Sequence, residues 1–246
     1  MFARVTVHAD DWAASERFYT TVLGVLGIAP TAHRAHDGMV VWDDFALVAA
    51  AAGEPPTRHL HVGFVAPSRG AVDAFWRAGV KGGYPDAGRP GEREYTEDYY
   101  GAFLLDPDGN SVEAVHHGDV RRGGHIDHLW IGVRDLDAAD AFYRTIAPHT
   151  GLRATSGTHG RGFLGAWATF SLIDDGRPPT EHLHLAFPAP DRDTVDAFHA
   201  AALAAGYGDH GPPARHSQDG LGDYAASVLD PDGTHVESVF RDTATR

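Results

Sequence analysis

Apolar and polar residues alternate along several short segments of this chain, which is typical of strands that bury one face. The alternation is clear over residues 2–8, 126–133 and 183–187, and shorter apolar runs occur near 40–48 and 166–173. Elsewhere apolar residues recur at helical spacing, which predicts helices near 12–23, 70–80, 137–147 and 192–205. Strands and helices mixed in this order predict an α+β fold.

The order of these elements occurs twice, so the chain contains an internal repeat. His59-Leu60-His61-Val62 matches His182-Leu183-His184-Leu185, 123 residues later. Each half then contains two strand–helix–strands units, four in the whole chain. We expect one domain at residues 1–118, a polar, glycine-rich linker at 119–124, and a second domain at 125–246.

A second repeated motif is Asp-Pro-Asp-Gly, at 106–109 and again at 230–233. It lies between two apolar runs and predicts a tight turn, because proline presets φ and glycine accepts a positive φ. Glu113 and Glu237 follow the two glycines by four residues and lie on the returning strands. A glutamate inside a strand is unusual. Its occurrence after both turns points to a function.

The strands have two distinct faces. On the strand at 126–133, Leu129 and Ile131 share one face, while His128 and Trp130 share the other. On the strand that begins near His182, the leucines likewise lie opposite His182 and His184. The aliphatic face suits packing under helices, and the mixed face suits a concave, partly solvated cup.

Composition narrows the class of protein. The net charge of -14 argues against nucleic acid and anionic membranes as partners. The absence of cysteine excludes disulfides, thiolate ligands and a cysteine nucleophile. No apolar stretch has the length of a membrane span, and the N-terminal residues have no signal-peptide pattern. We expect a cytoplasmic monomer or homodimer that binds a small-molecule substrate.

One residue from the cup face of each key strand in the second half gives a candidate metal site: His128, His184 and Glu237. Two neutral imidazoles and one carboxylate bind a divalent ion and leave positions open for a substrate. Fe²⁺ or Mn²⁺ is the first expectation, with Zn²⁺, Ni²⁺ or Co²⁺ as alternatives. The competing interpretation is two histidines that bond to neighbours and a glutamate that pairs with an arginine.

These motifs together resemble the vicinal oxygen chelate superfamily. They are the His-Leu strands, the Phe142-Tyr143 pair on a helix, and Asp-Pro-Asp-Gly-x-x-Val-Glu. The superfamily contains glyoxalases, extradiol ring-cleaving dioxygenases and bleomycin-type resistance proteins. The resemblance covers nearly the whole chain and implies four βαβββ units, paired in two glyoxalase-like domains, with a sheet curled around a metal-centred cup. It also implies metal ligation by His128, His184 and Glu237.

Departures from the family pattern bear on the reaction. The position of the fourth glyoxalase ligand holds Ser171, which weakens a glyoxalase assignment. The usual tyrosine of ring-cleaving dioxygenases is replaced by Ser227, with Tyr224 three residues earlier. His216, in the preceding segment, could act as an acid or base near neutral pH, or be an ordinary loop residue. His216 and Tyr224 are the candidate catalytic residues.

In the first half the aligned residues are Arg4, His61 and Glu113, with Ala46 in the fourth position. A permanently charged arginine cannot ligate a metal. The first half is therefore expected to be a scaffold with a degenerate metal site, its Arg4 paired with Glu113.

Three functions follow from these residues. The first is a metal-dependent enzyme, dioxygenase-like or lyase- or isomerase-like, in which two oxygens of the substrate chelate the ion. The second is a metal-free binding protein, of the antibiotic-resistance kind, with a cup lined by aromatic residues. The third is a scaffold whose sites have both decayed. The aromatic candidates for the cup are Trp130, Phe163, Trp167 and Tyr224.

Overall fold

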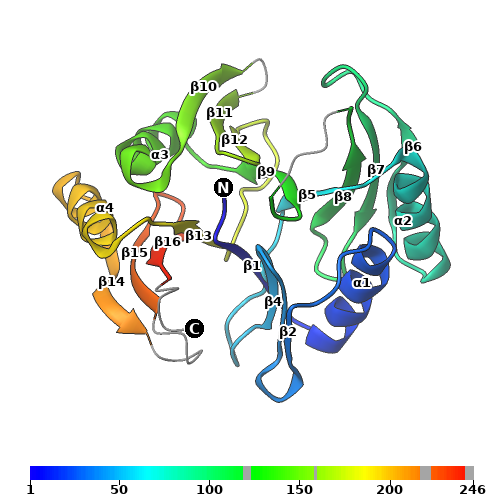
Figure 1. Ribbon diagram of the computed structural model, residues 1–246, viewed down its shortest axis with the longest axis horizontal. Helices are drawn as coiled ribbons and strands as arrows, with labels where there is room; N and C mark the ends of the chain where they lie inside the picture. The colour runs from blue at the N-terminus through cyan, green and yellow to red at the C-terminus, as the bar shows by residue number, and fades with distance from the viewer. Residues whose placement is uncertain (119–122, 158–159, 217–222, 242–246) are drawn as a thin grey trace. The chain divides into compact units, whose positions relative to one another are not determined.

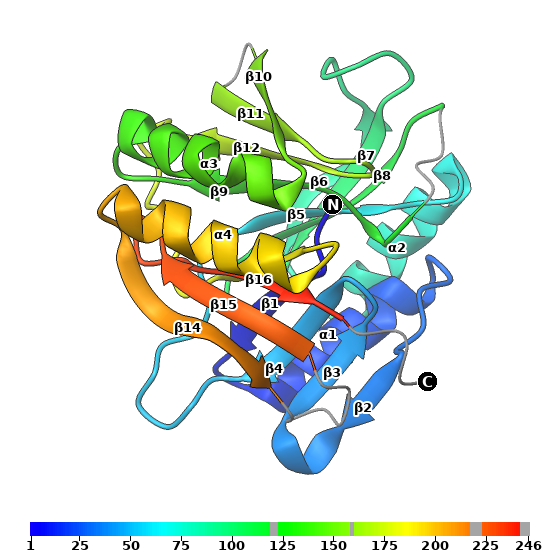
Figure 2. The same ribbon diagram turned by 60° about the vertical axis from the view of Figure 1, so that its left-hand side comes forward.

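The computed structural model describes residues 1–118, 123–157, 160–216 and 223–241 (Figures 1 and 2). The helices are α1 (Trp12–Gly24), α2 (Arg69–Lys81), α3 (Leu136–Thr150) and α4 (Arg192–Ala204), with a short 3₁₀ turn η1 (Ala35–Asp37). The strands of the first half are β1 (Arg4–Ala9), β2 (Ala32–Arg34), β3 (Met39–Trp42), β4 (Phe45–Ala49), β5 (His61–Val65), β6 (Asp86–Glu92), β7 (Tyr100–Leu105) and β8 (Ser111–His116). Those of the second half are β9 (Ile126–Gly132), β10 (Arg153–Gly157), β11 (Gly160–Leu164), β12 (Thr169–Ile173), β13 (His184–Pro188), β14 (Gly208–His216), β15 (Asp223–Leu229) and β16 (His235–Phe240).

The strands form two mixed eight-stranded sheets, which confirms the predicted α+β fold class. One sheet has the order β14-β15-β16-β13-β1-β4-β3-β2, and the other has the order β10-β11-β12-β9-β5-β8-β7-β6. Most neighbours are antiparallel, but β5 pairs with β8 and β13 pairs with β16 in parallel. Each sheet takes strands from both repeats, which a division of the chain at its midpoint does not anticipate.

Two compact units divide the chain at places other than the repeat boundary. One contains Met1–Val5 with Gly132–Arg246, and the other contains Thr6–Ile131. Strand pairing explains the exchange: the amide of Ala3 donates to the carbonyl of Ala186, and β9 pairs with β5. The part of the predicted linker at residues 119–122 lies outside the described residues.

The helices begin at side-chain caps, as the polar residues before them predict. Asp11, Ser68, Asp135 and Asp191 each accept a hydrogen bond from a backbone amide of the first turn. Within its own unit, α2 packs across β6, β7 and β8, and α4 packs across β14, β15 and β16 (Figure 2). The faces of these strands that α2 and α4 do not cover are available for a functional site.

Both Asp-Pro-Asp-Gly motifs form the predicted turns, with positive φ at Gly109 and Gly233. Asp106 organises the first turn: its Oδ1 accepts hydrogen bonds from the amides of Asp108 and Asn110. Its Oδ2 accepts a hydrogen bond of 2.8 Å from the buried hydroxyl of Tyr19 on α1. The turn is thereby fixed to a helix, and the strand that leaves it, β8, carries Glu113 in a defined register.

Several strands were not predicted from the hydrophobic pattern, among them all four edge strands. They are β2, β6, β10, β11 and β14, and the edge strand β6 contains two glycines and a proline. Edge strands tolerate such residues because one side of the ladder needs no partner. The run predicted at 166–173 is shorter in the structure, where β12 spans Thr169–Ile173. No helix in the described part of the chain has the length and apolar character needed to cross a membrane.

Candidate metal centre

Three neighbouring strands, β9, β5 and β8, bring the candidate ligands together. In the β5–β8 register Gly63 lies opposite Glu113, and in the β5–β9 register it lies opposite His128. Gly63 has no side chain, so the imidazole and the carboxylate can lean over it toward each other. His61 lies two residues before Gly63 and therefore on the same face. The ladder thus places two imidazoles and a carboxylate on one face of the sheet.

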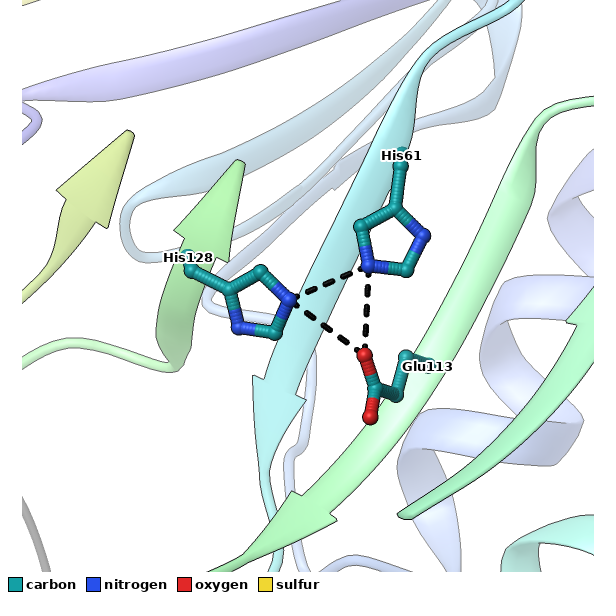
Figure 3. Close-up of side chains that lie close together, drawn as sticks. All are labelled: His61, Glu113 and His128. Carbon is teal, nitrogen blue, oxygen red and sulfur yellow. Dashed lines mark hydrogen bonds and ion pairs between the residues drawn. The ribbon is translucent and has the colours of Figure 1, made fainter. Parts of the chain in front are cut away.

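The three side chains converge on a common point (Figure 3). Nε2 of His61 lies 3.0 Å from Nε2 of His128 and 3.1 Å from Oε2 of Glu113. Nε2 of His128 lies 3.3 Å from the same carboxylate oxygen. All three residues are buried, and Glu113 is only 1% exposed. Such groups are costly to bury together unless a proton or a cation lies between them.

This donor set fits a divalent metal ion. Ligand atoms that share one ion at the usual bond lengths lie about 3.0–3.4 Å apart, and the three distances here span 3.0 to 3.3 Å. Two histidines and one carboxylate on one face are the facial arrangement that leaves further coordination positions open. Among the described residues, His61, Glu113 and His128 form a group of potential metal ligands whose ligand atoms all lie within 4.8 Å of one another.

A surrounding layer of polar groups orients the three ligands. Nδ1 of His128 donates to Oδ1 of Asp127 at 3.0 Å, and Nε2 of His117 donates to the other oxygen of Asp127 at 2.9 Å. Nδ1 of His61 lies 2.9 Å from the hydroxyl of Ser111. With each Nδ1 engaged, each Nε2 is directed at the common point, as in metal sites with a carboxylate behind the histidine.

Tyr99 plays the same part for the carboxylate. Its hydroxyl donates to Oε1 of Glu113 at 2.8 Å, which leaves Oε2 directed at the two histidines. Burial, the charge of Glu113 and this hydrogen bond all raise the pKa of Tyr99, so the hydroxyl remains a donor throughout the physiological range. Glu113 is thus held in an orientation that offers one oxygen.

The charges of the cluster are strongly coupled. Burial alone would raise the pKa of Glu113, but hydrogen bonds from His128 and His61 outweigh it and lower the pKa to about 2. Burial would lower the pKa of His128, but its hydrogen bonds to Asp127 and Glu113 raise it to about 9. These opposite shifts favour an ion pair between a protonated His128 and an ionised Glu113.

This proton predicts a pH dependence of metal binding. A raised pKa means that His128 keeps its proton up to about pH 9, so an incoming ion must displace that proton at lower pH. We expect the metal affinity to rise about tenfold per pH unit between pH 6 and 9 and then to level off. Competition with a chromogenic chelator at each pH measures the affinity.

An Asp127→Asn variant should shift the pH at which the affinity levels off to a lower value, because it removes one of the carboxylates that raise the pKa of His128. It should also weaken binding above that pH by about 10- to 100-fold. Asp209→Asn is the matched control, since Asp209 accepts from His199 away from the cluster. A pH profile identical in Asp127→Asn and wild type would contradict this role of Asp127.

The structure groups the predicted ligands differently from the sequence analysis. His128 was expected to join His184 and Glu237, but it lies on β9, between β12 and β5, whereas β13 and β16 belong to the other sheet. The partners of His128 are His61 and Glu113, which we had assigned to a scaffold. The physical reason is strand pairing: β9 of the second repeat pairs with β5 of the first.

In the other unit, His184 and Glu237 lie together without a second imidazole in the position of His128. Nε2 of His184 is 3.2 Å from Oε2 of Glu237, and the ring of His184 stacks on that of His235 at 4.0 Å. Arg4 occupies the repeat position of His128, and a guanidinium cannot ligate a metal. The degenerate set is therefore Arg4, His184 and Glu237.

Of the two predicted catalytic residues, the structure describes the side chain of Tyr224. The hydroxyl of Tyr224 donates to Asp196 on α4 at 2.8 Å, and Tyr100 of the other repeat donates to Asp73 on α2 in the same way. This repeated strand-to-helix contact favours a structural role for Tyr224. His216 is the last residue of β14, and its side chain is outside the described part of the chain.

The aromatic residues expected to line the cup differ in their burial and in their neighbours. Trp130 lies beside the cluster, with its ring 4.8 Å from that of His61. Phe163 is fully buried and stacks on Phe170, so its assignment to the cup was wrong. Trp167 is 48% exposed. Ser171, the position of the fourth glyoxalase ligand, lies on β12 opposite Gly162.

Sequence reasoning missed the residues that support the ligands. A Cβ atom at position 63 would lie 2.6 Å from Nδ1 and 2.9 Å from Nε2 of His128, so only glycine leaves this imidazole its place. The other repeat has Ala186 at this position and Ala3 where Asp127 stands. These differences between the repeats were visible in the sequence and could have identified the better-supported set of ligands.

Comparisons with known proteins agree with the repeat and the fold. A model of the Glyoxalase/Bleomycin resistance protein/Dioxygenase superfamily matches residues 2–114 and 125–238. Among curated proteins, none matches the chain. A mutant of glyoxalase I from Zea mays superposes with a TM-score of 0.70 at 16% identity, over 97% of this chain and 93% of that one. A candidate dioxygenase from Bacillus subtilis subsp. subtilis str. 168 has a TM-score of 0.63 at 15% identity, over 98% and 84% of the two chains. At such identities the two structures share the fold.

Proposed function

Because the chain belongs to the Glyoxalase/Bleomycin resistance protein/Dioxygenase superfamily, we propose that it is a divalent-metal-dependent enzyme. Its substrate would be a small organic molecule with two neighbouring oxygen atoms, and its reaction would be dioxygenase-like or lyase- or isomerase-like. The observation that carries the proposal is the convergence of His61, Glu113 and His128, whose ligand atoms lie within 4.8 Å of one another. These three residues would hold the ion.

The bound ion would act as a Lewis acid that polarises the substrate oxygens. The protein prepares for this by fixing its own groups in advance. Asp127 and Ser111 hold the two imidazoles through Nδ1, and Tyr99 holds one oxygen of Glu113. Little reorganisation is then needed when an ion binds, which is the condition for a precise metal site.

The ligand types favour Fe²⁺ or Mn²⁺, with Zn²⁺, Ni²⁺ and Co²⁺ as alternatives. Two imidazoles with one carboxylate and open positions are typical of Fe(II) sites in oxygenases, and carboxylate also suits manganese. The chain has no cysteine, so thiolate ligands that would select softer ions are absent. The metal is thus expected to be a hard or borderline ion.

Metal content tests the proposal directly. Protein purified without a metal-affinity tag should contain about one equivalent of a divalent metal by mass spectrometry, or take up about one after anaerobic loading with Fe²⁺ or Mn²⁺. The loaded protein is then screened with small organic compounds that can chelate a metal through two neighbouring oxygen atoms, with and without dioxygen. Less than about a tenth of an equivalent after loading would overturn the enzyme proposal and point to a metal-free binding protein instead.

A further inference from the structure

Partly exposed aromatic rings surround His61 at the cluster. The ring of Trp130 lies 4.8 Å from the imidazole of His61, and the ring of Phe103 lies 5.8 Å from it. Tyr95, which is 47% exposed, packs edge-on against Trp130 at 5.7 Å. Flat rings around a polar centre bind planar apolar groups, because stacking and edge contacts add to the burial of area.

The ring of Phe103 contacts a cation, Arg93, as well as His61. Its guanidinium carbon is 5.4 Å from the centre of the Phe103 ring. The guanidinium also donates to the carbonyl of Arg89 at 2.7 Å, with longer hydrogen bonds to those of Glu92 and Gly101. Four contacts therefore fix the position of this cation next to the aromatic rings.

No carboxylate of the described residues pairs with the guanidinium of Arg93. Its contacts in the described structure are backbone carbonyls and an aromatic ring, without a carboxylate within 4.0 Å. Other arginines of the same unit do pair with carboxylates, as Arg69 does with Glu92 and Arg89 with Asp86. In a chain of net charge -14, an arginine that is held in place but left without a counter-charge is suited to an anionic ligand.

A glycine, Gly91, lies close to the guanidinium of Arg93, as Gly63 lies close to the imidazole of His128. A Cβ atom at position 91 would lie 3.1 Å from the Arg93 guanidinium, a tight contact, whereas one at 63 would collide with His128. From the matching pairs Gly91–Gly101 and Ala214–Ala225, the repeat position of Gly91 is Ala214, and that of Arg93 is His216. The arginine and its glycine therefore belong to the repeat that supplies His61 and Glu113.

We propose that the substrate of this site carries an aromatic or planar conjugated body and a carboxylate, and that Arg93 binds the carboxylate. The ring of Phe103, which contacts both His61 and Arg93, would lie against the planar body between the metal ligands and the guanidinium. The rings of Trp130 and Tyr95 would border the body beside His61. Arginine binds carboxylates through two parallel hydrogen bonds, which fixes orientation as well as charge. This inference rests on the proposed function, because it identifies the substrate class of the same site.

Two matched probes test it: 3,4-dihydroxybenzoate, which carries vicinal oxygens, an aromatic ring and a carboxylate, and catechol, which lacks the carboxylate. Both are titrated under nitrogen by calorimetry into Mn²⁺-loaded protein. The wild type should bind the carboxylate probe at least about tenfold more tightly than catechol. Arg93→Gln should abolish this preference while leaving the affinity for catechol and the metal content unchanged. Arg93→Lys should retain part of it.

Arg89→Gln is the control, because it removes the same charge four residues earlier, on β6, at a guanidinium that lies over Trp76. It should keep the preference for the carboxylate probe. Equal preference in wild type and Arg93→Gln, or no binding of either probe to the metal-loaded wild type, would overturn the inference and leave the metal site standing. Failure of the wild type to bind Mn²⁺ would overturn the proposed function instead. The ratio of the affinities for 3,4-dihydroxybenzoate and catechol, measured on the metal-free wild type and Arg93→Gln, would then decide the role of Arg93.

Discussion

Replacing His61 with alanine is expected to remove the bound metal ion, whereas the same replacement of His184 leaves it bound. The two histidines occupy the same position in the two repeats, at the start of β5 and of β13. Nε2 of His61 faces Nε2 of His128 at 3.0 Å, whereas Arg4 stands at the repeat position of His128 in the other set. Loss of one of three protein ligands should lower the affinity by at least about 100-fold, more than the loss of an outer partner does.

The measurement is the metal content and affinity of both variants, purified and loaded in parallel. His184→Ala is a close control, because it deletes an imidazole that also lies near a glutamate, at 3.2 Å. Far-ultraviolet circular dichroism of both variants checks that the fold is kept. Loss of metal from His184→Ala but not from His61→Ala would restore the set His128, His184 and Glu237 and refute the grouping by strand pairing.

Adding a single methyl group at Gly63 should damage the site almost as severely. The new Cβ would lie within 3.0 Å of both ring nitrogens of His128, so the imidazole must move away from Glu113. The imidazole is held on its other side by Asp127, at 3.0 Å, and cannot move without losing that hydrogen bond. We expect the metal affinity of Gly63→Ala to fall at least about tenfold, with the fold retained, since Ala186 occupies the same position in the other repeat.

Gly208→Ala provides the comparison for this prediction. Gly208 also lies in a strand, but a Cβ there would meet only Leu229, at 3.9 Å, which is ordinary van der Waals contact. Both variants gain one methyl group and lose the same backbone freedom in the unfolded chain. If Gly63→Ala bound metal as tightly as Gly208→Ala, the close approach of His128 to Gly63 would not be a condition of the site.

The candidate ligands could be recognised from sequence as a group, but they could not be divided into two sites. The repeat supplies two histidine–glutamate pairs, His61 with Glu113 and His184 with Glu237, and two first-strand residues, Arg4 and His128. Each division of these residues leaves one intact triad and one triad with arginine. Counting ligands therefore cannot distinguish the divisions, and the division by chain order, with His128, His184 and Glu237 together, is as complete as the other.

The supporting residues carried more information than the ligands themselves. Gly63 and Asp127 occur only beside one set, and their repeat counterparts are Ala186 and Ala3. The counterpart of His216 in the other repeat is Arg93, and a catalytic role of His216 stays a prediction. Hydrophobic pattern placed the helices and the turns well because these features depend on local periodicity and on turn residues.

The sequence by itself determined the α+β class, the fourfold repeat of units, the two tight turns and the types of side chain that could hold a metal. These depend on residues close together in the chain. The tertiary structure alone decided that β9 pairs with β5, and with it that His128 joins His61 and Glu113. Pairing between strands far apart in sequence depends on backbone hydrogen bonds, which every strand can offer equally, so side-chain pattern does not specify the partner.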